Sequence, residues 1–306
     1  MSETLLAPGA LNFAGRTSKL LGMAGDFIAL TRPRVLMLVL FTAPAGMVMG
    51  REGWPEPAVL IAVIVGAALI GGGCGALNAW IERERDAKMK RTMDRPLPTD
   101  RLSPRQALVF GLLTSAAGLG LLLTVGGRLS ATIGALTLIH YIFVYTLWLK
   151  PRSPQNIVIG GAAGATAPLI ADAAVNGAIG PWSLVLFAII FLWTPPHFWA
   201  IALYRKDEYA AAGFPMMPVV VGDAATRKKM LAYACALWPI TLLPWIGGAL
   251  GPVYGLTAFV AGGYFVASIV RAKRIARSEE DRRVFAISIM YLSLLFSVML
   301  LELLIA

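Results

Sequence analysis

Long apolar segments separated by short polar ones run through almost the whole chain. A helix that crosses the hydrocarbon core of a bilayer needs about 20 predominantly apolar residues. Nine segments approach or reach this length, at residues 35–50, 57–80, 106–126, 129–149, 156–175, 182–203, 230–249, 252–270 and 285–305. The pattern predicts an all-α polytopic membrane protein with nine transmembrane helices, and we expect residues 1–306 to form a single membrane-embedded domain. Within the sixth segment, Pro195 and Pro196 predict a kinked or broken helix.

The overall composition agrees with this pattern. Of the 306 residues, 58% are hydrophobic and only 14% are charged, which is too apolar for a soluble globular domain. Glycine clusters at 71–75 and 160–164 lie inside predicted spans rather than in phosphate-binding loops. In lipid, small residues let helices approach closely, so we interpret these clusters as helix-packing positions that could also leave room for a bulky ligand.

Basic residues fall predominantly on one side of the predicted membrane. Cytoplasmic loops retain Lys and Arg, and placing residues 1–30 in the cytoplasm leaves only Arg51 and Arg128 of the 27 basic residues on the other side. Two long loops, at about 80–105 and 204–229, then face the cytoplasm, and the odd number of spans puts the C-terminus outside. The net charge of +10 would meet anionic membrane lipid or an anionic substrate, and nucleic-acid binding is not expected.

The first long loop begins with polar side chains at helical spacing. Asn78, Glu82 and Asp86 fall within an arc of about 80° and climb roughly 12 Å along a helix, so they can point into one cavity. A solvated helix end with intrahelical ion pairs is the alternative. The position of Asn78 and Glu82 at or inside the hydrocarbon boundary favours a functional site, because polar groups there are costly.

A magnesium-bound diphosphate would explain this group of side chains. Mg²⁺ is usually held by one or two carboxylates, while water and phosphate oxygens complete its coordination. Arg91 and Arg95 follow the acidic residues closely, and guanidinium groups bind phosphate through forked hydrogen bonds.

Three stretches of the chain resemble one known family. They are Asn78…Glu82…Asp86 with Arg95-Pro-Leu-Pro98, the stretch from Tyr145 to Gly164, and the stretch from Trp193 to Pro218. Together they are similar to the intramembrane aromatic prenyltransferases of the UbiA superfamily, and within it to the protohaem IX farnesyltransferase (haem O synthase) branch. The resemblance extends from Thr31 to the last span, and it departs from the usual pattern at Glu82, where the superfamily commonly has Asp.

The resemblance implies a UbiA-type bundle around a central cavity that transfers a farnesyl group from farnesyl diphosphate to a vinyl group of haem B. Water would quench the resulting cation to give haem O, and no protein nucleophile is required. Residues expected to hold Mg²⁺ and to act in catalysis are Asn78, Glu82, Asp86 and Asp207, with Glu208 as the rival of Asp207. Residues expected to bind the diphosphate are Arg34, Arg91, Arg95, Lys150 and Arg152.

The two histidines, His197 and His140, are the candidates for contact with haem, since haem iron often takes an axial histidine. A buried neutral histidine bonded to a neighbouring carbonyl is the alternative for each. The resemblance further implies a bacterial cytoplasmic (inner) membrane and a possible hand-over of product to haem A synthase or a terminal oxidase. Two other functions stay open: transfer to another aromatic acceptor, such as a quinone precursor or chlorophyllide, and haem or lipid transport without catalysis.

Overall fold

The computed structural model describes residues 22–49 and 53–305, with the side chain of Arg34 left out. Residues 1–21 of the predicted N-terminal segment, residues 50–52 with Arg51, and residue 306 lie outside the described residues. Eight helices are long and apolar enough to cross a membrane, and a bent pair, Gly22–Leu30 with Val35–Val48, makes up to nine. The prediction of an all-α, multi-span membrane protein is confirmed.

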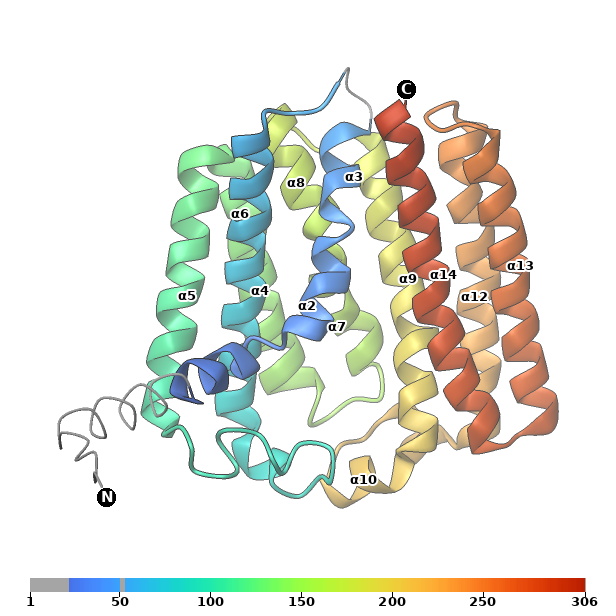
Figure 1. Cartoon of the computed structure of the whole chain (residues 1–306). Helices are drawn as coiled ribbons and strands as arrows, with labels where there is room; N and C mark the ends of the chain where they lie inside the picture. Colours follow the sequence, from blue (N-terminus) through green and yellow to red (C-terminus); the bar gives the residue numbers. More distant parts are fainter. Residues whose placement is uncertain (1–21, 50–52, 306) are drawn as a thin grey trace, which may run out of the picture.

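The helices form a bundle of upright rods (Figure 1). In chain order they are α2 Pro33–Leu40, α3 Ala43–Val48, α4 Pro57–Asp86, α5 Pro104–Val125, α6 Gly127–Ile139, the π-helix η1 His140–Leu149, α7 Asn156–Ala165, α8 Ala167–Asn176, α9 Pro181–Tyr204, α10 Lys206–Ala211, α11 Met217–Val221, α12 Asp223–Ile246, α13 Pro252–Ile275 and α14 Ser278–Ile305.

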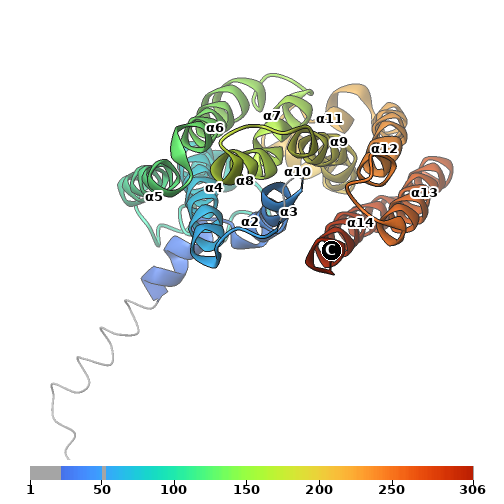
Figure 2. The same cartoon turned by 90° about the horizontal axis from the view of Figure 1, so that it is seen from above.

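An inner ring of helices can be followed from contact to contact. It runs from α2 to α4, η1, α7, α9, α14 and α3, and α3 in turn touches α2. Helix α5 packs outside α4, while α12 and α13 pack outside α9 and α14. The same arrangement is seen along the helix axes in Figure 2. Residues of five of these helices, α2, α4, η1, α7 and α9, line a common interior space.

Small residues bring α4 and α5 into close contact. A Cβ added at Gly73 would lie 2.1 Å from the Ser115 hydroxyl oxygen, and one added at Gly118 would lie 2.8 Å from the Gly66 carbonyl oxygen. Lipid tails are as apolar as leucine, so helices in a bilayer associate through close packing rather than through the hydrophobic effect. The packing role expected for the first glycine cluster is therefore present at Gly73.

The first and fifth predicted spans are each divided into two helices. The first breaks between α2 and α3, where Pro44 occupies the first turn of α3. The fifth breaks at Thr166, where Pro168 begins α8 in the same way. Proline has no backbone N–H to continue the preceding helix, and its ring favours the first turn of a new one.

The sixth predicted span is not broken at its two prolines. Helix α9 is one element from Pro181 to Tyr204 although Pro195 and Pro196 lie inside it. Packing on several sides holds this segment in place, because α9 contacts α7, α12 and α14. The Trp193 indole also donates a hydrogen bond to the Ser288 carbonyl, 2.8 Å away.

The two long loops lie at the same end of the bundle, and the C-terminal end of α14 lies at the other end (Figure 1). The first loop is shorter than predicted because α4 continues to Asp86. It ends at a capping box in which Ser103 and Gln106 satisfy each other's backbone N–H groups. The second contains the short helices α10 and α11. Both loops therefore border the same end of the interior space.

Candidate active site

A cavity of about 520 Å³ opens inside the helix ring, next to the two long loops. Charged side chains line one part of it: Arg32, Glu82, Asp86, Arg91, Arg95 and Lys150. Apolar residues and glycines line another: Val35, Val39, Ile157, Gly160, Gly161, Gly164, Ile190, Trp193 and Phe198. Such a division suits a ligand with an anionic head and a hydrocarbon tail.

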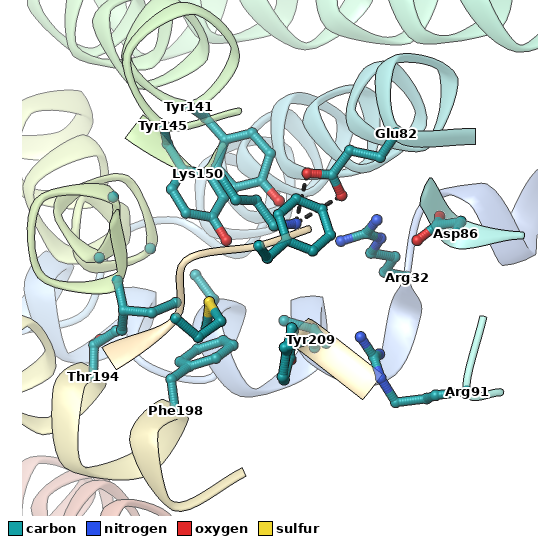
Figure 3. Close-up of a pocket in the computed structure, with 18 of the residues that line it drawn as sticks. Arg32, Glu82, Asp86, Arg91, Tyr141, Tyr145, Lys150, Thr194, Phe198 and Tyr209 are labelled. Carbon is teal, nitrogen blue, oxygen red and sulfur yellow. Dashed lines mark hydrogen bonds and ion pairs between the residues drawn. The ribbon is translucent and has the colours of Figure 1, made fainter. Parts of the chain in front are cut away.

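Two carboxylates at the end of α4 face the charged part of the cavity (Figure 3). Glu82 and Asp86 are each only 4% exposed. Lys150 Nζ donates to Glu82 Oε2 over 2.7 Å, and Arg95 Nη1 donates to Asp86 Oδ2 over 2.7 Å. Helical spacing of four residues places both acids on one face of α4. The buried Oε1 of Glu82 has no hydrogen bond, although it lies 2.6 Å from the same Lys150 ammonium.

Asn78 lies one helical turn before Glu82 on α4 and is fully buried. It is not among the residues that line the cavity. Its side-chain oxygen accepts a hydrogen bond from Arg32 Nη2 over 2.5 Å. Its amide nitrogen donates to the Thr146 hydroxyl over 3.0 Å. Asn78 therefore holds Arg32 in place and links α4 to η1.

Arg32 enters the cavity from the connection that precedes α2. Its backbone is left-handed, with φ 55° and ψ 55°, and Pro33 begins the helix immediately after it. This conformation costs a non-glycine residue about 1–2 kcal/mol, so the surrounding contacts must hold it. The buried Arg32 Nε has no hydrogen-bond partner, which leaves one donor of the guanidinium unused.

The π-helix η1 brings Lys150 to the face of Tyr141 and Tyr145, whereas an α-helix would turn it away from them. Tyr141, Tyr145 and Lys150 all line the cavity. At ~100° per residue, an α-helix would turn Lys150 to about 180° from Tyr141. A π-helix bonds i to i+5, and the Lys150 amide accordingly donates to the Tyr145 carbonyl over 2.8 Å. Residues four or five apart then share a face, which brings the lysine to Glu82.

The second long loop closes the charged end with aromatic side chains. Tyr209 from α10 and Phe214 after it line the cavity. Two cations lie near the Phe214 ring, Arg85 at 5.0 Å and Lys150 at 4.9 Å from its centroid. Cation–π contacts of this kind attract the charges to the ring and join the second loop to α4 and η1.

Asp207 lies on α10 but is exposed and is not among the cavity-lining residues. Its neighbour Glu208 is paired with Arg205 over 2.9 Å. The structure thus turns Tyr209, rather than either acid, toward the cavity. Across the described residues, no three His, Cys, Asp or Glu side chains are close enough to hold a metal ion by themselves.

Three of the five cations expected to bind the diphosphate line the cavity. They are Arg91, Arg95 and Lys150. Burial, together with the charge of Arg32, lowers the pKa of Arg95. Arg152 is exposed and donates to the carbonyls of Leu147 and Trp148 over 2.8 and 3.2 Å, so it caps the end of η1. The side chain of Arg34 lies outside the described residues.

Neither histidine is among the cavity-lining residues. His140 Nε2 donates to the Ile159 carbonyl over 2.9 Å and so joins η1 to α7. His197 is buried and stacks on Trp193 with ring centroids 4.1 Å apart. The Ser288 hydroxyl donates to the Phe285 carbonyl over 2.6 Å, so His197 Nδ1 must donate to Ser288 Oγ, 2.7 Å away. His197 Nε2 then keeps its lone pair.

Sequence reasoning missed Arg32, the two tyrosines of η1 and the aromatic pair of the second loop. The sequence held a signal for Arg32. Pro33 marks the start of a helix, so Arg32 immediately precedes a predicted membrane-spanning segment. No comparable signal marks Tyr141 and Tyr145, whose common face with Lys150 depends on the π-helix.

Comparison with known proteins finds relatives that match most of this chain. Protoheme IX farnesyltransferase of Erythrobacter litoralis is 46% identical over 89% of this chain and 90% of its own length. The protein of the same name from Methylobacterium radiotolerans is 46% identical over 92% and 90%. The one from Acidiphilium cryptum is 42% identical over 99% of both chains.

Solved structures with low sequence identity share the fold. A digeranylgeranylglyceryl phosphate synthase has a TM-score of 0.77 at 13% identity and covers 93% of this chain and 100% of its own. A UbiA homolog from Archaeoglobus fulgidus bound to DMAPP and Mg²⁺ has a TM-score of 0.60 at 15% identity and covers 89% and 99%. The model of the UbiA prenyltransferase family matches residues 39–295. This chain therefore belongs to the UbiA prenyltransferase family.

Proposed function

We propose that this protein transfers the farnesyl group of farnesyl diphosphate to a vinyl group of haem B, with addition of water, to give haem O. The observation that carries the proposal is the pair of buried carboxylates, Glu82 and Asp86, beside four cations at one end of an otherwise apolar cavity. The choice of haem as acceptor is supported by the names of relatives that are 42–46% identical over most of the chain.

The residues present fit a magnesium ion that is shared with the substrate. Two carboxylates without a third protein acid match the usual protein contribution to Mg²⁺, whose remaining ligands are water and phosphate oxygens. Glu82 and Asp86 would hold the ion, and both acids line the cavity with their side chains facing the other charged residues. When bound, Mg²⁺ neutralises charge that develops on the departing diphosphate. Asn78 positions Arg32 in this account, and exposed Asp207 has no part in it.

The cations of the cavity would bind the diphosphate and stabilise it as it leaves. Lys150 and Arg95 now pair with the two acids, and an entering diphosphate offers them more oxygen acceptors. Arg32 and Arg91 add two further guanidinium groups. Preorganised charges in a site that excludes water stabilise developing negative charge strongly.

The bond changes balance without a protein nucleophile. The C–O bond of farnesyl diphosphate breaks, and the diphosphate leaves with the electron pair. The haem vinyl group donates its π electrons to the farnesyl cation, forming a C–C bond. Water adds to the new cationic carbon and loses a proton, which leaves a hydroxyl group on the product. Tyr209 and Phe214 would keep bulk water from the cation at the loop end.

His197 is the residue that we propose for contact with haem. It packs against Trp193 and Phe198, which line the cavity, and its Nε2 keeps a lone pair for iron. His140 already bonds the Ile159 carbonyl and serves as the control. Replacing His197 by Gln should shift the Soret band of bound haem, whereas His140→Gln should not; an unchanged band in the first variant would remove the assignment.

We further propose a bacterial inner-membrane location with the two long loops in the cytoplasm and the C-terminus outside. The bias of basic residues toward the loop end supports this orientation, and hand-over of haem O to haem A synthase or a terminal oxidase would follow within the same membrane. Cysteine labelling at introduced sites in the two loops tests the orientation. Labelling of the loops by a reagent confined to the outer side would show that the orientation is the opposite one.

The function is tested by incubating the purified protein with haem B, farnesyl diphosphate and Mg²⁺ and analysing the haems by mass spectrometry. The expected result is a product heavier than haem B by one farnesyl group and one hydroxyl group. Turnover with a quinone precursor or chlorophyllide but not with haem would change the acceptor. Haem binding without turnover of any acceptor would favour transport.

A further inference from the structure

One glycine of α7 differs from its neighbours in what surrounds it. Gly160, Gly161 and Gly164 all line the cavity. A Cβ added at Gly160 would lie 2.1 Å from the Tyr145 ring, and one added at Gly161 would lie 2.9 Å from the Thr194 side chain. A Cβ added at Gly164 would meet nothing within 4 Å. The first two glycines accommodate neighbouring side chains, whereas Gly164 borders open space in the cavity.

Gly164 lies at the end of the cavity that is remote from the charges. Helix α7 begins at Asn156, beside the end of η1, and runs away from the loops. At about 1.5 Å per residue, Gly164 is roughly 10 Å deeper than Ile157. On α9, Ile190 is likewise about 12 Å further from the loops than Phe198. No charged residue lines the cavity at this depth among the described residues.

We propose that Gly164 determines the longest prenyl chain that the cavity accepts. The proposal rests on the proposed function, which places the diphosphate among the cations and directs the hydrocarbon toward the apolar end. The end of the chain would then lie against the α7 backbone at Gly164, where the missing side chain supplies the space for its last isoprene unit. A Cβ at this position would enter that space without displacing any residue of the protein.

The size of the effect follows from the energetics of apolar pockets. One methylene group more or less in such a pocket changes discrimination by about 10- to 200-fold. Leucine at position 164 would remove the space of several carbon atoms, and alanine that of one. A donor shorter by one isoprene unit would still fit, because the cations that hold its diphosphate are unchanged.

The test measures kcat/KM for geranyl, farnesyl and geranylgeranyl diphosphates with haem B as acceptor and Mg²⁺ present. In Gly164→Leu, we expect the ratio of farnesyl to geranyl kcat/KM to fall by at least about 10-fold. Gly164→Ala should change the ratio in the same direction by less. Gly120→Leu is the matched control, because Gly120 also has nothing within 4 Å of an added Cβ but is exposed on the outside of α5.

The outcomes separate this inference from the function on which it rests. If the unaltered protein transfers no prenyl group to haem, the proposed function fails. If it does so and the ratio stays the same in Gly164→Leu, or in Gly164→Ala should the leucine variant not fold, the role of Gly164 is overturned. An equal change in Gly120→Leu would also overturn it, since that side chain cannot reach the cavity.

Discussion

Buried ion pairs occur in two regions near the loop end of the bundle, and they differ in how completely their atoms are used. Between α12 and α14, Arg227 and Asp281 form a forked pair through two hydrogen bonds, of 2.9 and 2.5 Å. Their side chains are 6% and 1% exposed, and neither residue lines the cavity. Every carboxylate oxygen of this pair has a guanidinium partner.

The pairs in the cavity are less complete. A single ammonium, Lys150 Nζ, serves both oxygens of Glu82, at 2.6 and 2.7 Å, and Asp86 accepts one hydrogen bond from Arg95. Arg32 Nε is buried without a hydrogen bond. Leaving a polar atom unsatisfied inside a protein costs about 1–3 kcal/mol. We infer that a forked pair whose atoms are all paired joins two helices, whereas an incomplete pair that faces a cavity can still bind a ligand.

The largest effect is expected from breaking the forked pair. Asp281→Asn leaves the buried Arg227 charge without a counterion, which should destabilise the protein by about 3–5 kcal/mol. Thermal unfolding in detergent measures this, with exposed Glu279→Gln as the control. Turnover per folded molecule should stay the same. A variant of normal stability would show that the pair does not hold α12 to α14.

The cavity acids should show the opposite behaviour. Glu82→Gln and Asp86→Asn should each lower turnover by about 10²- to 10³-fold, comparable to losing one electrostatic contact at a reacting centre. Thermal unfolding should change less than in Asp281→Asn, because the partner cations Lys150 and Arg95 border the cavity and are more exposed than Arg227. Glu84→Gln is the matched control, because Glu84 lies on the same helix with its side chain 83% exposed. Normal turnover in both cavity variants would remove the metal assignment.

The smallest effect separates two arginines that were expected to act alike. Arg95→Gln removes a charge-assisted hydrogen-bond donor from the cavity and should raise the KM for farnesyl diphosphate roughly 10- to 100-fold. Arg152→Gln removes only a cap at the surface and should change KM by about twofold or less. Steady-state kinetics on both variants measure the difference, and equal KM values would contradict the distinction.

The sequence was sufficient to predict the elements that depend on local apolar length and helical spacing. The membrane-spanning helices follow from runs of about 20 apolar residues, and the common face of Glu82 and Asp86 follows from their spacing on α4. The position of Asp207 could not be predicted in this way, because the orientation of a short helix in a loop depends on its tertiary contacts. Lys150 and Tyr141 share a face only in a π-helix, which α-helical periodicity does not reveal. Continuity of α9 through two prolines likewise depends on packing against three other helices.

In the proposed function, Glu82 and Asp86 bind the diphosphate through a shared magnesium ion. The most direct test is the affinity for an unreactive thiolo analogue of farnesyl diphosphate, measured by calorimetry with Mg²⁺ and in metal-free buffer. We expect the unaltered protein to bind at least about 100-fold more tightly with Mg²⁺, and we expect the Glu82→Gln, Asp86→Asn double variant to lose this difference. Equal affinity with and without Mg²⁺ in the unaltered protein would contradict the account.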